Sequence, residues 1–556
     1  MVKMGKLIVP MLMTICAAAE TPLFRVGILT DTHWTENPRS FERTEAALRI
    51  MKREKVDLVC HLGDIADRHH TSAYRYYREK LFPAVFPENP PRELFVYANH
   101  DALKRNAPTS VVRSEIPGFF AALRRELGIP NAPDDRVVFK GYPFVIFQQF
   151  VDQETMEKML AETAREFPEG PIFVLDHVPA PKNVDGANDK RRVVYGKYPR
   201  VVHLYGHVHM SLRDENPIWQ GTHTEVGAGC LQNWRGYLVG TSPGNKDSFE
   251  FPIMDVYKDK LVFRRISTED GKEFKEPWVV PLPFDPATAP YAPERRAAAA
   301  AAPEFAPEAK LKLKANRPFS ALSISWPEAK QGGEVYKYFV RIAVREADGK
   351  FREFARQDSY SEFYLAPDKR KGKLAQRISD GYFEPGREYR ISVSPVGFFG
   401  REGAPIEEKF TAPADVRKVE TVFESRDPMK ELVFASGLVG EEPLKIENGF
   451  YRHPGGSARL IIPKKYWAGE RGARFRFTVD MDIRQSSGKN WTMVLRNPKP
   501  KQIAHNRINL EGGDAAGRRY VIEFGKRSEK YFYDLLIREG APGLIRFNYV
   551  KIEKLP

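Results

Sequence analysis

The chain has 556 residues, more than one hydrophobic core accommodates, because cores stop growing at roughly 250–300 residues. About two to four domains are therefore expected. Hydrophobic residues make up 42% and charged residues 29% of the chain, a mixture that excludes a disordered protein. No apolar run reaches about 18 residues, so no transmembrane helix is expected. Three cysteines exclude a scaffold stapled by disulfides, and whether Cys60 and Cys230 pair is left open.

The formal net charge of +14 favours anionic partners such as phosphoesters, acidic polysaccharide, lipid headgroups or nucleic acid. The excess is largest in residues 413–556, which hold 27 Lys and Arg against 18 Asp and Glu. Solubility of an exported domain is the simpler explanation. Aromatic residues do not recur regularly among these cations, so the pattern gives nucleic acid little support, without excluding it.

The first 19 residues have the pattern of an export signal. Lys3 and Lys6 precede an apolar stretch, residues 7–16, and three alanines follow at 17–19. The apolar stretch is too short to span a bilayer. We therefore expect residues 1–19 to be a signal peptide and the exported chain, periplasmic, secreted or at the cell surface, to begin near Glu20.

Between residues 24 and 266, short apolar runs alternate with helical patterns. A helix is expected over 41–55, and strands are expected over 24–30, 56–62, 93–98, 171–176 and 201–205. Strands that alternate with helices predict an α/β layered fold. In such sheets ligands bind beyond the carboxyl ends of the strands, so polar residues after each strand are expected to form one site.

Five polar blocks follow these strands in chain order: Asp31-x-His33, Gly63-Asp64-x-x-Asp67-Arg68, Asn99-His100-Asp101, His177 and Gly206-His207-x-His209. Carboxylate, imidazole and amide ligands together suit Mn, Fe or Zn better than Ca or Mg. Two such cations lower the pKa of bound water and neutralise phosphoryl oxygens, which hydrolysis of a phosphoester requires. Asp64, beside the permissive Gly63, suits the position of a carboxylate shared by both metals.

The order and spacing of these blocks resemble the calcineurin-like metallophosphoesterase superfamily over about residues 24–266. The resemblance implies an α/β sandwich of two mixed sheets flanked by helices. It also implies a ligand set in which Asp64 bridges two metals, one held by Asp31, His33 and His209 and the other by Asn99, His177 and His207. His100 would protonate the leaving oxygen or hold the phosphate, and Asp67 would hydrogen-bond His100 and keep it charged.

Two positions differ from relatives of this kind. Ala98 stands where the superfamily normally has Gly, which requires a backbone that tolerates a Cβ atom at this point. Asp67 stands where purple acid phosphatases carry a tyrosine ligand, so their ferric site is not expected. Arg68 is a candidate phosphate-binding residue, with pairing to a surface carboxylate as the alternative. His203 and His223 are expected to be bystanders.

The rest of the chain predicts a linker and two all-β domains. Residues 281–308 are rich in Pro and Ala and are expected to form a linker or strap rather than a packed element. Residues 309–412 alternate apolar and polar residues. Trp326 and the later Pro385-Gly386-x-x-Tyr389 resemble a fibronectin type III sandwich. Residues 413–556 contain several strand-like runs, and their pattern weakly resembles a jelly-roll of the carbohydrate-binding type.

The sequence thus predicts a multidomain protein: an α/β domain over 20–280, the linker, and two β-sandwich domains. We interpret it as an exported phosphoesterase with two divalent transition metals, in which a metal-bridged hydroxide attacks a phosphate mono- or diester. The alternatives are an exported nuclease on the same fold, and a non-catalytic surface protein that binds glycan or an anionic cell-surface polymer through the C-terminal domain. Substrate choice is assigned to cap loops over 101–170 and 180–200, whose sequence does not identify the substrate.

Overall fold

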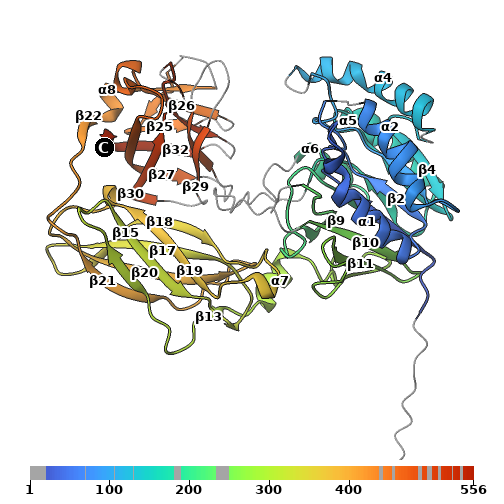
Figure 1. The fold of residues 1–556 in the computed structure, drawn as a ribbon, viewed down its shortest axis with the longest axis horizontal. Helices are drawn as coiled ribbons and strands as arrows, with labels where there is room; N and C mark the ends of the chain where they lie inside the picture. The colour runs from blue at the N-terminus through green and yellow to red at the C-terminus, as the bar shows by residue number, and fades with distance from the viewer. Residues whose placement is uncertain are drawn as a thin grey trace, which may run out of the picture.

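The computed structural model describes residues 20–68, 71–104, 107–128, 131–180, 189–232, 249–437, 443–453, 457–485, 491–496, 504–510, 515–526, 528, 530–538 and 543–556. Three lobes follow one another along the chain. The first stands at one end of the second, and the third lies along one side of the second (Figure 1). The expected signal peptide, residues 1–19, lies outside the described residues. Among the helices of the described part, none is long and apolar enough to cross a membrane.

Two mixed six-stranded sheets form the centre of the first lobe. The first sheet has the order β12 (Trp278–Pro281), β11 (Lys260–Ser267), β10 (Glu250–Val256), β1 (Phe24–Leu29), β2 (Leu58–His61) and β3 (Arg92–Phe95). The second has the order β4 (Asp135–Phe139), β5 (Tyr142–Ile146), β6 (Ile172–Leu175), β7 (Val201–Tyr205), β9 (Thr224–Gly227) and β8 (Ile218–Gln220). Strands β1 to β3 are parallel, as are β5, β6, β7 and β9.

The two sheets pack face to face, and helices cover their outer faces. Ile28 and Cys60 of the first sheet share one apolar core with Phe173 and Leu204 of the second. The helices on the first sheet are η1 (Pro38–Phe41), α1 (Glu42–Arg53), α2 (Thr71–Tyr76), η2 (Tyr77–Leu81), α3 (Phe82–Val85) and α4 (Thr109–Leu127). Those on the second are α5 (Gln153–Glu166) and α6 (Asp189–Tyr195). The layered α/β fold with mixed sheets agrees with the expectation.

The segment 101–170 is not the cap loop that the sequence led us to expect. It contains α4, the sheet strands β4 and β5, and α5. The apolar faces of these elements are part of the cores, as Phe119, Phe144 and Leu160 show by their complete burial. A helix with an internal proline, Pro117 in α4, and strands of only five residues gave no clear periodic signal. Of the second expected cap loop, 180–200, residues 181–188 lie outside the described part.

The segment 281–308 packs more than a linker would. Tyr291 donates its backbone N–H to Gln220 and accepts one from that residue, so it covers the open edge of β8. Arg296 of the short helix α7 (Pro293–Ala299) donates to the carbonyl of Ile218 at 3.0 Å. An unpaired strand edge would otherwise expose its backbone groups, so this segment acts as the edge's cover.

The second lobe is all-β. One sheet has the order β14 (Lys312–Ala315), β15 (Ala321–Pro327) and β19 (Lys373–Ser379), and the other has β18 (Phe351–Tyr360), β17 (Val335–Arg345), β20 (Glu388–Gly397) and β21 (Ile406–Thr411). Small additions are β13 (Pro303–Glu304) with β16 (Gln331–Gly332), and the turns η3 (Pro367–Lys369) and η4 (Asp380–Tyr382). Tyr389 accepts a backbone N–H from Glu384 through its hydroxyl at 2.6 Å, the contact expected of a tyrosine corner. The fibronectin type III assignment stays a prediction.

The third lobe is also all-β. One sheet has the order β24 (Ile446–Glu447), β25 (Phe450–His453), β32 (Gly543–Leu555), β27 (Arg474–Gln485) and β30 (Ala515–Gly525), with β22 (Glu420–Ser425) also on β32. The other has β23 (Val433–Ser436), β26 (Ser457–Ile461), β31 (Asp534–Arg538), β28 (Trp491–Arg496) and β29 (Ala504–Leu510), and the short helices are α8 (Pro428–Glu431) and η5 (Lys464–Trp467). Phe477 and Leu535 from the two sheets share one buried core.

Candidate metal centre

The polar blocks predicted from the sequence follow the carboxyl ends of strands in both sheets. In the first sheet, Asp31 follows β1, Asp64 follows β2 and Asn99 follows β3. In the second sheet, His177 follows β6 and His207 follows β7. Because the two sheets face each other, these strand ends bring residues far apart in the sequence to one edge of the sandwich.

Most of these side chains are carried by unusual backbone. Asp31, His33, Asp64, His207 and His209 all have positive φ, between 46° and 73°. Each such conformation in a non-glycine residue costs ~1–3 kcal/mol, and it is typical of functional sites where surrounding structure enforces it. The strand-end pattern in the sequence carries no signal for this strain.

Close contacts with neighbouring groups explain why glycine occupies positions 63 and 206 of the polar blocks. A Cβ atom on Gly206 would lie 1.9 Å from the hydroxyl of Thr30, so no other residue fits there. Gly63 has a φ of +91°, and its Cβ would lie 2.7 Å from the methyl group of Ala98 and 2.9 Å from His177. Ala98 itself lies outside the left-handed region, so the backbone tolerates a Cβ atom there, and its methyl group occupies space that Gly63 leaves open.

Four buried side chains form the first cluster of ligand atoms: Asp31, His33, Asp64 and His209. Nε2 of His209 lies 3.0 Å from Oδ1 of Asp31. Nε2 of His33 lies 3.4 Å from Nε2 of His209. Two imidazole nitrogens that point at each other beside a carboxylate are the arrangement expected around a cation.

The second cluster consists of Asp64, His177 and His207, so Asp64 belongs to both clusters. Nε2 of His177 lies 3.1 Å from Oδ2 of Asp64 and 3.1 Å from Nδ1 of His207. Nδ1 of His177 lies 2.7 Å from the carbonyl oxygen of Leu62. A carbonyl can only accept, so Nδ1 carries a proton, and Nε2 is the nitrogen that faces Asp64 and would bind a cation, the usual arrangement of a histidine ligand.

Two buried oxygen atoms that lack a hydrogen-bond donor indicate whether cations fit between these side chains. Oδ1 of Asp31 and Oδ1 of Asn99 are buried and accept no hydrogen bond of good geometry within the described residues. Buried polar atoms are almost always satisfied, so unsatisfied acceptors at a cluster of imidazoles call for a missing positive partner. The residues present therefore fit two divalent cations, with the amide oxygen of Asn99 as one of the donors.

The charge state of the carboxylates supports the same conclusion. Burial raises the pKa of Asp31, but the imidazoles of His209, His177 and His33 outweigh burial and hold this pKa well below its usual range. Burial also opposes the charged forms of Asp64 and His177. Their mutual attraction nevertheless lowers the pKa of Asp64 to about 2 and raises that of His177 to about 9. Both carboxylates are thus anions that positive charge stabilises.

His100 and Asp67 lie beside the first cluster. Nδ1 of His100 lies 2.7 Å from Oδ1 of Asp67, and the same oxygen lies 3.3 Å from Nδ1 of His33. Hydrogen bonds from these two imidazoles hold the pKa of Asp67 well below its usual range. The backbone N–H of His100 donates to Oδ1 of Asp64 at 2.8 Å. The contact of Asp67 with His33 was not expected from the sequence.

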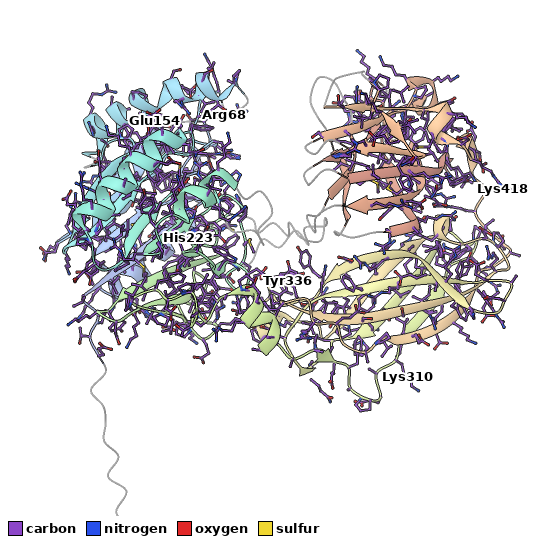
Figure 2. All side chains as sticks on the ribbon, turned by 180° about the vertical axis from the view of Figure 1, so that it is seen from behind. Arg68, Glu154, His223, Lys310, Tyr336 and Lys418 are labelled. Atoms are coloured by element: carbon purple, nitrogen blue, oxygen red, sulfur yellow. The ribbon has the colours of Figure 1, made fainter. Side chains whose placement is uncertain are left out.

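Arg68 is exposed, and no ion pair to it forms within the described part of the chain. Its backbone N–H donates to the carbonyl of His100 at 2.7 Å, which keeps it at the site. Figure 2 shows Arg68 near the end of the first lobe, whereas His223 lies elsewhere in that lobe. His223 and His203 both contact Glu225, at 2.7 and 3.0 Å, and belong to neither metal cluster.

Other residues near the polar blocks either pack in the core or fall outside the described part of the chain. Trp34 is completely buried, stacked on Phe41 and Tyr77, so it is core and does not line the site. His69, His70 and Trp234 lie outside the described residues. Cys60 and Cys230 are buried free cysteines and do not pair.

Asp101 is a site residue whose role sequence reasoning missed. Its Oδ1 accepts the backbone N–H groups of Ile65 and Ala66, both at 2.9 Å, and its Oδ2 accepts that of Ala98 at 2.9 Å. It thus ties the loop of Asp64 to the loop of Asn99. Burial, followed by the nearby Asp64, raises the pKa of Asp101 to about 8. The block Asn99-His100-Asp101 named this residue, but its spacing gave no sign of a structural role.

Comparison with known proteins identifies the first lobe. The family model for calcineurin-like phosphoesterases matches residues 24–211, a span that contains all five polar blocks. These residues therefore form a calcineurin-like metallophosphoesterase domain, as the sequence predicted. A comparison with curated protein sequences finds no match.

Solved structures give more distant matches. A dimetal phosphatase from Danio rerio is 15% identical, covering 46% of this chain and 98% of that one, with a TM-score of 0.32. A purple acid phosphatase from yellow lupin (Lupinus luteus) seeds is 16% identical, covering 47% of this chain and 54% of that one, with a TM-score of 0.32. A tandem CBM22 pair from Paenibacillus barcinonensis is 9% identical, covering 46% of this chain and 93% of that one, with a TM-score of 0.18. At these TM-scores none of the three supports a statement about activity.

Proposed function

We propose that the protein is an exported phosphoesterase that uses two divalent transition metals, Mn, Fe or Zn, to hydrolyse phosphate mono- or diesters. One observation carries the proposal: Asp64 belongs to both buried clusters of ligand atoms, which is the position of a carboxylate that bridges two cations. In this proposal Asp31, His33 and His209 hold one metal. Asn99, His177 and His207 hold the other.

The residues around the two clusters have separate tasks. When bound, two divalent cations lower the pKa of water and neutralise the charge on phosphoryl oxygens. Nδ1–H of His100 hydrogen-bonds to Asp67, and in this proposal a proton on Nε2 of His100 passes to the departing ester oxygen. The exposed guanidinium of Arg68 is available to the substrate phosphate, whose negative charge and paired oxygens suit this group.

Export and a glycan-binding role for the third lobe remain part of the proposal. Support for export comes from the charged start, apolar stretch and alanines of residues 1–19. Support for a glycan or anionic polymer partner is limited to the all-β third lobe and its positive charge.

Hydrolysis of para-nitrophenyl phosphate and bis(para-nitrophenyl) phosphate by the full chain tests the activity. We expect turnover that exhaustive chelation and dialysis abolish and that added Mn²⁺ or Zn²⁺ restores, because the attacking water depends on the metals. A portion dialysed without chelator is the control. Undiminished turnover after chelation, or no turnover of either ester with any metal added, would contradict the proposal.

A further inference from the structure

A buried carboxylate that binds no predicted metal precedes His177. Asp176 is completely buried and belongs to none of the clusters of ligand atoms found among the described residues. Its Oδ2 accepts the hydroxyl of Tyr195 at 2.7 Å and the Nε–H of Arg191. Its Oδ1 accepts the backbone N–H of Val178 at 3.2 Å. Oδ2 is thus engaged by two residues of α6, and Oδ1 by the backbone of its own loop.

Arg191 connects this carboxylate to a second segment. Its NH2 group donates to the backbone carbonyl of Gln149 at 2.7 Å. Gln149 in turn accepts the backbone N–H of Asn99 through Oε1 at 2.7 Å, and its own N–H donates to the carbonyl of Tyr97. A continuous chain of polar contacts therefore runs from the residue before His177 to the backbone of Asn99.

We infer that Arg191 is a positioning residue for the half of the metal centre formed by Asn99, His177 and His207. This inference rests on the proposed function, because it assigns Arg191 a task toward the second metal. Asn99 follows a strand of the first sheet and His177 a strand of the second, and Arg191 joins the two segments from one side. It sets the separation between the amide oxygen of Asn99 and the Nε2 atom of His177.

The chemistry of the pair explains why an arginine stands here. The guanidinium is a flat fork whose donors point in fixed directions, so one group satisfies a carboxylate and a carbonyl together. Arg191 is 7% exposed, and a charge buried this deeply is stable only when it is paired.

Metal binding by the full chain tests this assignment without recourse to turnover. We expect the parent chain to bind two Mn²⁺ ions, with the electron paramagnetic resonance spectrum of a spin-coupled pair. In Arg191→Gln one of the two ions should bind about 10–100-fold more weakly, the usual cost of losing an outer partner of a metal ligand, and the spectrum should become that of single Mn²⁺ ions. Arg191→Lys keeps the charge but not the forked guanidinium, so its affinity for this ion should lie between those of the parent and Arg191→Gln.

Two further variants make the result decisive. Arg192→Gln, at the next position of α6, should bind both ions like the parent. If Arg191→Gln does not fold, Gln149→Met is the second test. It removes the side-chain oxygen that accepts the backbone N–H of Asn99 and leaves the pair of Arg191 and Asp176 in place. Binding of the same ion should become weaker. Two tightly bound ions in the folded variants would overturn the inference and leave the proposed function standing. A parent chain that binds no pair of ions would overturn both.

Discussion

Asp64 and His100 are joined by one hydrogen bond, yet they have different tasks at the site. Asp64→Asn should lose metal as well as turnover, because it removes the anion that both clusters share. His100→Ala keeps the backbone N–H that holds Asp64, so it should retain both metals and slow turnover by roughly 10²–10⁴-fold if the imidazole is a general acid. The loss should shrink for nitrophenyl esters, whose leaving group needs little protonation.

Elemental analysis and rates on esters with good and poor leaving groups distinguish these outcomes. Asp57→Asn is the matched control for Asp64→Asn, because Asp57 precedes β2 and Asp64 follows it; it should keep both metals. The acid assignment would be wrong if His100→Ala lost metal as Asp64→Asn does, or slowed all esters equally.

For individual residues, the sequence predicted which side chains lie close together at the site. It did not predict the contacts that position them. His177 could be placed because it directly follows an apolar strand. Gln149 and Arg191 could not, because each acts through a backbone group of a distant segment, and no spacing in the sequence encodes such a contact. The same holds for Asp101, whose carboxylate accepts hydrogen bonds from backbone N–H groups of two loops.

A buried carboxylate, that of Glu225, links strands β7 and β9 away from the metal clusters. His203 of β7 is the register partner of Glu225 of β9, and His223 contacts the second oxygen of that carboxylate. Burial raises the pKa of Glu225, but the two imidazoles outweigh burial and lower it to about 2. A carboxyl whose pKa is depressed in the folded state contributes stability that is present above its unfolded pKa, near 4.5, and is lost as the pH falls towards 2.

Acid unfolding of the full chain therefore depends on Glu225. The parent chain should lose stability between about pH 4.5 and 2 more steeply than Glu225→Gln, which has no carboxyl to protonate at this point. Urea unfolding followed by tryptophan fluorescence at several pH values measures the difference. Glu154→Gln, an exposed change on α5, should follow the parent. Parallel curves for the parent and Glu225→Gln would show that this pair does not control acid stability.

Element prediction was most successful where an apolar run had clear ends. The strand expected over 201–205 is β7, with the same ends. Prediction of elements from the sequence was least successful where tertiary contacts decide the structure. Tyr291 and Arg296 follow a stretch of Pro and Ala that is typical of a linker, but they pack because the edge of β8 is open at that place.

Buried ion pairs join the second lobe to the third. Asp380 of η4 accepts from Arg417 and from Arg476 of β27, both at 2.6 Å, and Arg476 also donates to Glu553 of β32. Asp380, Arg417 and Arg476 are each at most 7% exposed. Removing one partner from such a pair leaves an uncompensated buried charge and costs about 3–5 kcal/mol.

Arg476→Met should therefore uncouple the two β-rich lobes. In the parent, scanning calorimetry should record the second and third lobes unfolding together, and in Arg476→Met the third lobe should unfold at a lower temperature by itself. Arg474→Met is the control, because Arg474 lies on the same strand with half of its side chain exposed; it should behave as the parent. A single unchanged transition in Arg476→Met would contradict this coupling.

The first lobe contacts the second through ion pairs that are more exposed. Lys275 pairs with Glu215 of the first lobe at 3.0 Å and with Glu334 of the second at 2.5 Å. Figure 2 shows Tyr336 at this junction, where it packs on Phe398. The pattern of apolar and polar residues predicted an α/β region followed by β-rich regions. It could not predict how they dock, because these pairs join residues that share no local pattern.

The shared charges between the second and third lobes also bear on how such a chain can be inherited. Domains of this kind are often regarded as interchangeable modules that genetic recombination can shuffle. Here Asp380 lies in one module and Arg476 in the next, and both residues are buried. A recombination event that replaced only one of the two lobes would leave a buried charge without its partner. We therefore expect the two β-rich lobes to be inherited together as a single evolutionary unit.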